Sequence, residues 1–141
     1  MQHRLVCLAA LGALFLAGCA AQEPGTSAAQ ETDYTLVLLA GACHLVDQDR
    51  VACQGSVVNR SGPPLDNVLV NVTWLDAQGA AGRTDIASVA ANPLLPGWPA
   101  AWSVSGRYTP GLRRFRIAFA QFDGPPLSTR DDRDNPQDLL Q

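Results

Sequence analysis

Alternating apolar and polar residues dominate the middle of the chain and predict a series of β-strands. The pattern is clearest between residues 68 and 76, where Val68, Val70 and Val72 alternate with residues that would face the other side. A period of two residues is typical of a strand with one face in a core. Comparable signals recur along the chain, and we expect strands at residues 34–40, 51–59, 68–76, 83–89, 101–107 and 113–122.

Turn-forming residues separate these segments and interrupt every candidate helix. They occur at residues 62–64 (Gly-Pro-Pro), 77–79 (Ala-Gln-Gly), 93–99 (proline-rich) and 109–111 (Thr-Pro-Gly). No segment carries a 3.6-residue apolar stripe long enough for a helix. Short strands with turns between them indicate an all-β fold, and we predict an immunoglobulin-like antiparallel β-sandwich of about six to seven strands.

A different pattern marks the N-terminus. The apolar run at residues 5–16 is about a dozen residues long, too short for a hydrocarbon core that needs roughly 20. The segment Leu16-Ala17-Gly18-Cys19 ends this run and resembles the lipobox of bacterial lipoproteins. The resemblance implies a lipoprotein signal peptide at residues 1–18, cleavage between Gly18 and Cys19, and lipidation of Cys19.

Composition divides the remaining chain into three regions. Residues 19–33 lack apolar periodicity and are predicted to form a lipidated flexible tether with a random-coil span of about 20 Å. The β-sandwich domain is expected at residues 34–122. Residues 123–141 are acidic, contain few apolar side chains, and are predicted to be a disordered tail. Ala20 follows the anchor, where an Asp would retain a lipoprotein at the inner membrane, and therefore favours a periplasm-facing position on the outer membrane.

The charge balance argues against a nucleic-acid partner. The sequence has no lysine, and its ten basic residues are all arginines, against thirteen acidic residues. Only Arg4 lies in the predicted signal peptide, so the mature chain is net acidic and has no basic field for nucleic acid.

Cysteine usage predicts one disulfide. Cys7 would leave with the signal peptide and Cys19 would carry lipid, so Cys43 and Cys53 remain as a pair in an oxidising compartment. A hairpin with its loop at residues 47–49 would set the two cysteines directly opposite each other. Its register would pair Val46 with Arg50, Leu45 with Val51, and Cys43 with Cys53.

The same residues allow one alternative. His44 is the only histidine left after processing, and with Cys43 and Cys53 it could form a three-ligand metal site. The spacing matches no standard metal motif, so we predict no metal and no other cofactor. A catalytic triad would also need His44, and the chain has no glycine-flanked serine elbow, so we predict no catalytic residues and no enzyme activity.

Three further residues have structural interpretations. Trp74 is expected to be a large core side chain on a central strand. Asp76 and Asn59 are expected to organise turns.

Longer motifs resemble two families of bacterial envelope proteins. The segments are residues 55–61, 65–68, 74–79 and 96–97, which are similar to the FxLYD domain, and residues 109–116, which together with the same strand and turn resemble the YcfL-like periplasmic lipoproteins. The resemblance covers most of residues 34–122. It implies a fold of this kind and no catalytic residue.

Two sets of residues are candidates for a partner surface. Leu94, Leu95 and Trp98 form an apolar loop that would either bind a partner or cover the core. Arg107, Arg114 and Arg116 form a positive cluster that would either be a solvated strand face or bind an anion or a partner.

These observations predict a membrane-anchored envelope lipoprotein that acts as a non-catalytic protein-interaction or structural module, with an envelope protein as its partner. The alternative is a periplasmic metal-binding or trafficking protein that uses Cys43, His44 and Cys53.

Overall fold

The computed structural model describes residues 33–134 and 138–140, which belong to one compact unit spanning Glu31–Gln141. The predicted signal peptide, Cys19 and residues 19–32 of the predicted tether lie outside the described residues. The described chain contains strands and no helix. The strands are β1 (Leu36–Asp47), β2 (Arg50–Asn59), β3 (Val68–Asp76), β4 (Ala81–Ser88), β5 (Pro99–Arg107), β6 (Leu112–Gln121), β7 (Pro126–Leu127) and β8 (Thr129–Asp131).

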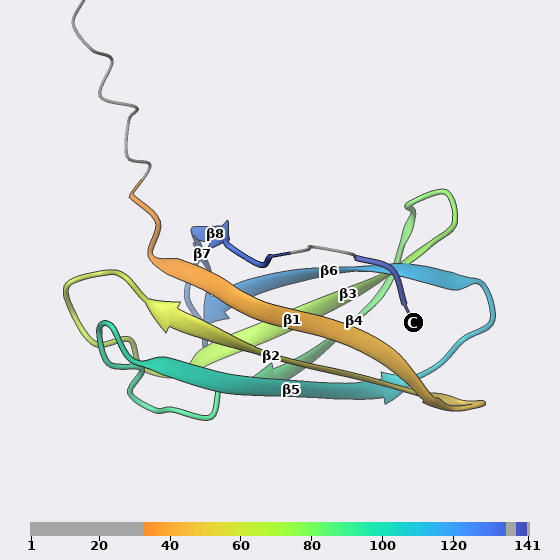
Figure 1. The fold of residues 1–141 in the computed structure, drawn as a ribbon, viewed down its shortest axis with the longest axis horizontal. Helices are drawn as coiled ribbons and strands as arrows, with labels where there is room; N and C mark the ends of the chain where they lie inside the picture. Colours follow the sequence, from red (N-terminus) through yellow and green to blue (C-terminus); the bar gives the residue numbers. More distant parts are fainter. Residues whose placement is uncertain (1–32, 135–137, 141) are drawn as a thin grey trace, which may run out of the picture. The chain divides into compact units, whose positions relative to one another are not determined.

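The strands form two four-stranded sheets, with the orders β5-β2-β1-β8 and β4-β3-β6-β7 (Figure 1). All neighbouring strands are antiparallel except β1 and β8, which are parallel. β2 lies beside β5, and β3 lies beside β6, as strands B and E and strands C and F do in immunoglobulin domains. The predicted immunoglobulin-like β-sandwich is therefore confirmed, with eight strands where six to seven were expected.

The six long strands correspond to the six predicted segments, and β3 has the expected bounds. β1 differs most, because it continues to Asp47 instead of ending near Ala40. The pairing with β2 shifts between Leu38 and Ala40, which marks a β-bulge. A bulge reverses which alternate residues face the core, so the simple period-two pattern breaks at this point.

The core lies between the two sheets and is built on aromatic side chains. Trp74 is fully buried and packs edge-on against Phe115, its neighbour across the β3–β6 pair, with ring centroids 6.4 Å apart. Trp102 packs in the same manner against Phe119, at 6.2 Å. The expected core position of Trp74 is therefore confirmed.

The prediction of a disordered tail is wrong for the part of residues 123–141 that is described. β7 pairs with β6, and β8 pairs with β1. Further on, the N–H of Phe115 donates to the carbonyl of Asp138, and the N–H of Leu140 donates to the carbonyl of Arg113. The tail lacks the apolar content to form a core of its own, but it binds through its backbone to the open edges of two sheets.

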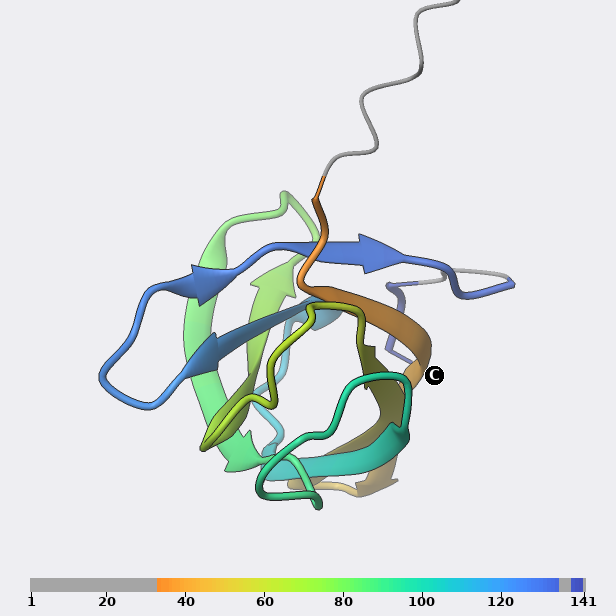
Figure 2. The ribbon, with the colours of Figure 1, turned by 90° about the vertical axis from the view of Figure 1, so that its left-hand side faces the viewer.

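One end of the sandwich is defined by the start of β1 and is called here the N-terminal end. Figure 2 views the domain from the left-hand side of Figure 1, so that the β2–β3 and β4–β5 loops face the reader. The β2–β3 loop lies beside the start of β1, because the N–H of Arg60 donates to the carbonyl of Thr35 (2.9 Å). The β4–β5 loop is joined to the end of β2, because the N–H of Gly97 donates to the carbonyl of Asn59 (2.8 Å). The opposite, distal end carries the β1–β2 hairpin turn.

Candidate interaction surfaces

The predicted disulfide is present at the β1–β2 hairpin. Cys43 and Cys53 are direct cross-strand neighbours with Cα atoms 4.0 Å apart, and both are buried. The turn is tighter than expected, since Arg50 pairs with Asp47 and not with Val46. The Asp47 carboxylate accepts a hydrogen bond from Arg50 Nε (2.6 Å) and one from the N–H of Asp49 (3.2 Å). These bonds, chiefly the one from Arg50, lower the pKa of Asp47.

The alternative metal site does not form around this disulfide. Both sulfurs are bonded to each other, so neither is a thiolate ligand. His44 is exposed and, as the residue after Cys43 on a strand, faces the other side of the sheet. In the part of the chain that the structure describes, no three side chains of the types His, Cys, Asp and Glu come together.

The two predicted turn residues both organise loops. The Asp76 carboxylate accepts hydrogen bonds from the N–H groups of Gln78 (2.9 Å) and Ala80 (2.8 Å) in the β3–β4 turn. Asn59 does more than was expected, because it is completely buried at the end of β2.

The amide of Asn59 joins the β2–β3 and β4–β5 loops. Its Nδ2 donates to the carbonyls of Pro63 (2.9 Å) and Leu94 (3.0 Å). Its Oδ1 accepts from the N–H (2.8 Å) and the hydroxyl (2.6 Å) of Ser61. An amide has two donor hydrogens and an acceptor oxygen with two lone pairs, so all of its hydrogen-bonding capacity is used. Asn59 therefore fixes the shape of the loop that carries Leu94.

A polar cluster closes the gap between β4 and β5. Asp85 Oδ2 accepts a hydrogen bond from Trp74 Nε1 at 2.7 Å, and Arg83 binds both oxygens of the same carboxylate through its Nε at 3.1 Å. Arg83 also donates to the carbonyl of Arg107 on β5. Each charged group is thus held by structural partners, and the cluster serves to link the edges of the two sheets.

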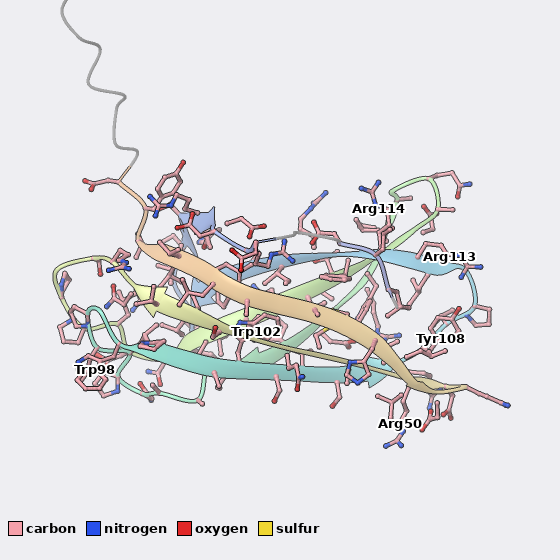
Figure 3. All side chains as sticks on the ribbon, in the orientation of Figure 1. Arg50, Trp98, Trp102, Tyr108, Arg113 and Arg114 are labelled. Atoms are coloured by element: carbon pink, nitrogen blue, oxygen red, sulfur yellow. A yellow bond between two sulfur atoms is a disulfide. The ribbon has the colours of Figure 1, made fainter. Side chains whose placement is uncertain are left out.

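The apolar loop divides into a buried and an exposed part. Leu94 is fully buried and pairs with Leu65, so of the two expected roles it has the second, covering the core, and it is not part of a partner surface. Leu95 and Trp98 remain exposed, with 70% of the Trp98 surface accessible. Figure 3 places Trp98 at the N-terminal end of the sandwich.

The predicted positive cluster is spread over two sheets. Arg107 ends β5 opposite Arg50 in one sheet, whereas Arg114 and Arg116 lie on β6 in the other. Both of the latter side chains are on the outer face, because Phe115 between them points into the core. Figure 3 shows Arg50 and Arg114 at the distal end of the domain. Arg107 and Arg114 therefore lie at the same end of the sandwich but on different sheets, and the predicted arginines do not form one patch.

A hollow lined mainly by residues of β1, β2 and β5 was missed by the sequence analysis. Its volume is about 660 Å³, and Gly41, Gly55 and Trp102 are among the residues that line it. Its walls are small or uncharged side chains, among them Ala40, Ala42, Gln54, Ser56, Ala101 and Ser103. None of the lining residues is titratable, so the hollow has no group for acid–base chemistry. Glycine and alanine at paired strand positions were the sequence signal that could have predicted this hollow.

Comparisons with protein-family models, with curated proteins and with solved structures found no match to this chain. Residues 33–134 and 138–140 form no helix of the length and apolar character that a bilayer crossing requires.

Proposed function

We propose that the protein is a lipoprotein of the bacterial cell envelope, anchored through Cys19, and that its β-sandwich is a non-catalytic interaction module. The single observation that carries the proposal is the lipobox-like segment Leu16-Ala17-Gly18-Cys19 at the end of a short apolar run. The Cys43–Cys53 disulfide supports it, because such bonds persist in the oxidising compartments outside the cytosol.

The arrangement of polar groups supports a non-catalytic role. The buried amide of Asn59 and the carboxylate of Asp85 are both bonded within the fold and hold loops and strands in place. A catalytic acid or base would instead direct its polar atoms toward a substrate. The partner is proposed to be a membrane-proximal envelope protein, since a tether of about 20 Å keeps the domain close to its leaflet.

Amine labelling tests the anchor. With no lysine in the chain, the mature protein has one primary amine, the α-amino group of Cys19. We expect that a fully acylated chain, once denatured, does not react with amine-directed reagents, and that its N-terminal peptide has the mass of lipidated Cys19. Efficient labelling at one site per chain, with an unmodified N-terminus, would contradict the proposal.

Crosslinking in intact envelopes tests the interaction. We expect the partner to be captured by the wild-type lipoprotein and lost with a Cys19→Ala variant exported by an ordinary signal peptide. Equal capture by the unanchored variant would show that the anchor does not direct the interaction.

A further inference from the structure

We infer that the N-terminal end of the sandwich rests on the lipid bilayer, with the indole of Trp98 inserted at the membrane interface beside Leu95 and Phe122. This inference rests on the proposed function, because the bilayer is within reach of this end through the lipid on Cys19.

Three large apolar side chains are exposed at this end. The exposed fractions are 70% for Trp98, 64% for Phe122 and 47% for Leu95. Isolated exposed apolar residues are common, but several on adjoining loops mark a contact surface.

Backbone and side-chain hydrogen bonds bring the three loops to the same end. The N–H of Gly97 donates to the carbonyl of Asn59 at 2.8 Å, which joins the Trp98 loop to the end of β2. The N–H of Phe122 donates to the carbonyl of Asn67 at 3.0 Å. The N–H of Asn67 in turn donates to Oδ1 of Asn92, in the loop that carries Leu95 and Trp98.

The β4–β5 loop, which carries Leu95 and Trp98, is held in one conformation, so the exposure of these two side chains follows from the fold. Asn59 donates to the carbonyl of Leu94, which is buried beneath the loop, and the backbone of Leu94 pairs with Leu65 in both directions, at 2.8 and 3.1 Å. With Leu94 fixed inward, Leu95 next to it is directed outward. A preorganised apolar tip loses little conformational entropy when it inserts.

The position of the anchor favours a lipid bilayer as the surface that the N-terminal end contacts. The predicted tether from Cys19 reaches Asp33 over about 20 Å, and Asp33 immediately precedes the N-terminal end. β1 has 12 residues and so extends about 40 Å from that end. When the N-terminal end rests on the leaflet, the distal end therefore lies too far from the leaflet to contact it. Tryptophan is enriched at membrane interfaces, where its ring contacts apolar chains and its N–H contacts water or headgroups.

Charge at this end is mixed. Arg60, Arg130 and Asp33 are exposed beside the start of β1, whereas Asp66 and Asp123 are exposed next to Asn67 and Phe122. Anionic lipid would attract the arginines and repel the carboxylates. We therefore expect apolar insertion to dominate, with little dependence on salt or on the fraction of anionic lipid.

The test uses the full lipidated protein in vesicles of phosphatidylethanolamine and phosphatidylglycerol, with or without bromine on the acyl chains near the glycerol backbone. Bromine quenches nearby indoles. Trp74 and Trp102 are buried in the core, so the difference between wild type and Trp98→Phe isolates the emission of Trp98. The matched control is Gln48→Trp in the Trp98→Phe background, which puts an exposed indole on the distal hairpin turn.

We expect brominated lipid to quench the Trp98 emission, with a shift to shorter wavelength on reconstitution, at low and at high salt. The indole introduced by Gln48→Trp should keep its emission. If the protein floats with the vesicles but Trp98 is quenched no more than the control, the bilayer contact is overturned and the anchor stands. If the protein does not float, the proposed anchor itself fails. Protection of Trp98 in native envelopes without quenching in vesicles would assign this end to a protein partner and also overturn the inference.

Discussion

The indole of Trp102 occupies the space that a side chain on Gly55 would need. The two residues are direct neighbours across the β2–β5 pair, and a Cβ atom built on Gly55 would lie 2.5 Å from Cζ2 of Trp102. The ring continues toward Gly41, where a Cβ atom would lie 3.1 Å from the same carbon. One large side chain on β5 thus fills the core beneath two glycines on neighbouring strands.

We predict that Gly55→Ala destabilises the domain by about 1–3 kcal/mol or more, because the methyl group would also meet the carbonyl of Ala40, which cannot rotate away. Chemical denaturation measures the effect. Gly62→Ala is the matched control, since a Cβ there meets nothing within 4 Å, and its effect should stay within about 0.5 kcal/mol. Equal stability of the two variants would refute the packing argument.

The disulfide should contribute substantially to stability. Cys53→Ser is expected to lower the free energy of unfolding by about 2–3 kcal/mol, because the bond closes a short loop in the unfolded chain. Making the same change in a Cys43→Ser background should add nothing further. Replacing the adjacent, exposed His44 by Ala should change stability by no more than about 0.5 kcal/mol, with or without added zinc. Stabilisation by zinc that depends on His44 would restore the metal alternative.

Arg133 should hold the C-terminal segment in place. Its side chain is only 7% exposed, and it bonds to Asp131 (2.6 Å), Asp138 (2.9 Å) and the carbonyl of Gly41 (3.2 Å). We predict that Arg133→Met costs about 1–3 kcal/mol at neutral pH, measured by thermal or urea unfolding. Arg130→Met is the control, because the exposed pair of Arg130 with Asp132 and its contact with the Tyr34 ring (5.7 Å) should each be worth at most about 1 kcal/mol.

The effect of Arg133 should depend on pH. The hydrogen bond from Arg133 lowers the pKa of Asp131 in the folded protein. Because the pKa of Asp131 is lower in the folded protein than in the unfolded chain, the ionised carboxylate stabilises the fold at pH values above the unfolded pKa of about 3.9. This contribution disappears as the pH falls through the folded pKa. The stability difference between wild type and Arg133→Met should therefore shrink below about pH 4. A difference that does not change with pH would show that Asp131 is not linked to Arg133.

Asn59 should be essential for the shape of the N-terminal end. Asn59→Ala removes two donors and two accepted bonds from a buried site, and we expect a loss of about 2–4 kcal/mol. Asn92→Ala, which affects exposed bonds to Asn67, should cost about 1 kcal/mol. Asn59→Asp should also destabilise, because a carboxylate would face the carbonyls of Pro63 and Leu94. Full stability of Asn59→Asp would contradict the assigned bonding.

Local patterns were sufficient to predict the long strands and the disulfide. Alternation identifies β3, and the spacing of Cys43 and Cys53 around a short turn places them opposite each other in an antiparallel hairpin. Both properties depend on residues that are close in the sequence. The predicted pairing of Val46 with Arg50 was wrong because the Asp47 side chain organises the turn, so that Asp47 pairs with Arg50 and the loop is shorter than the three residues expected.

The remaining features depend on contacts between distant segments. β7 and β8 have two and three residues, too few to show a period, and they form because β6 and β1 offer free edges. The burial of Asn59 requires the Leu94 loop to fold over it from another part of the chain. The separation of Arg107 from Arg114 follows from the sheet order alone.

The pairing of β8 with β1 joins Leu36 to Thr129, so the first strand obtains its second partner only when a segment 93 positions further along the chain becomes available. Such long-range pairings form late and slow the completion of a fold. If the chain is exported from its N-terminus, as the proposed function requires, the domain emerges with the edge of β1 unpaired, and this edge closes only after residues 129–131 have followed. Under the proposed function, the edge of β1 nearest the membrane would therefore stay open until most of the domain has been exported.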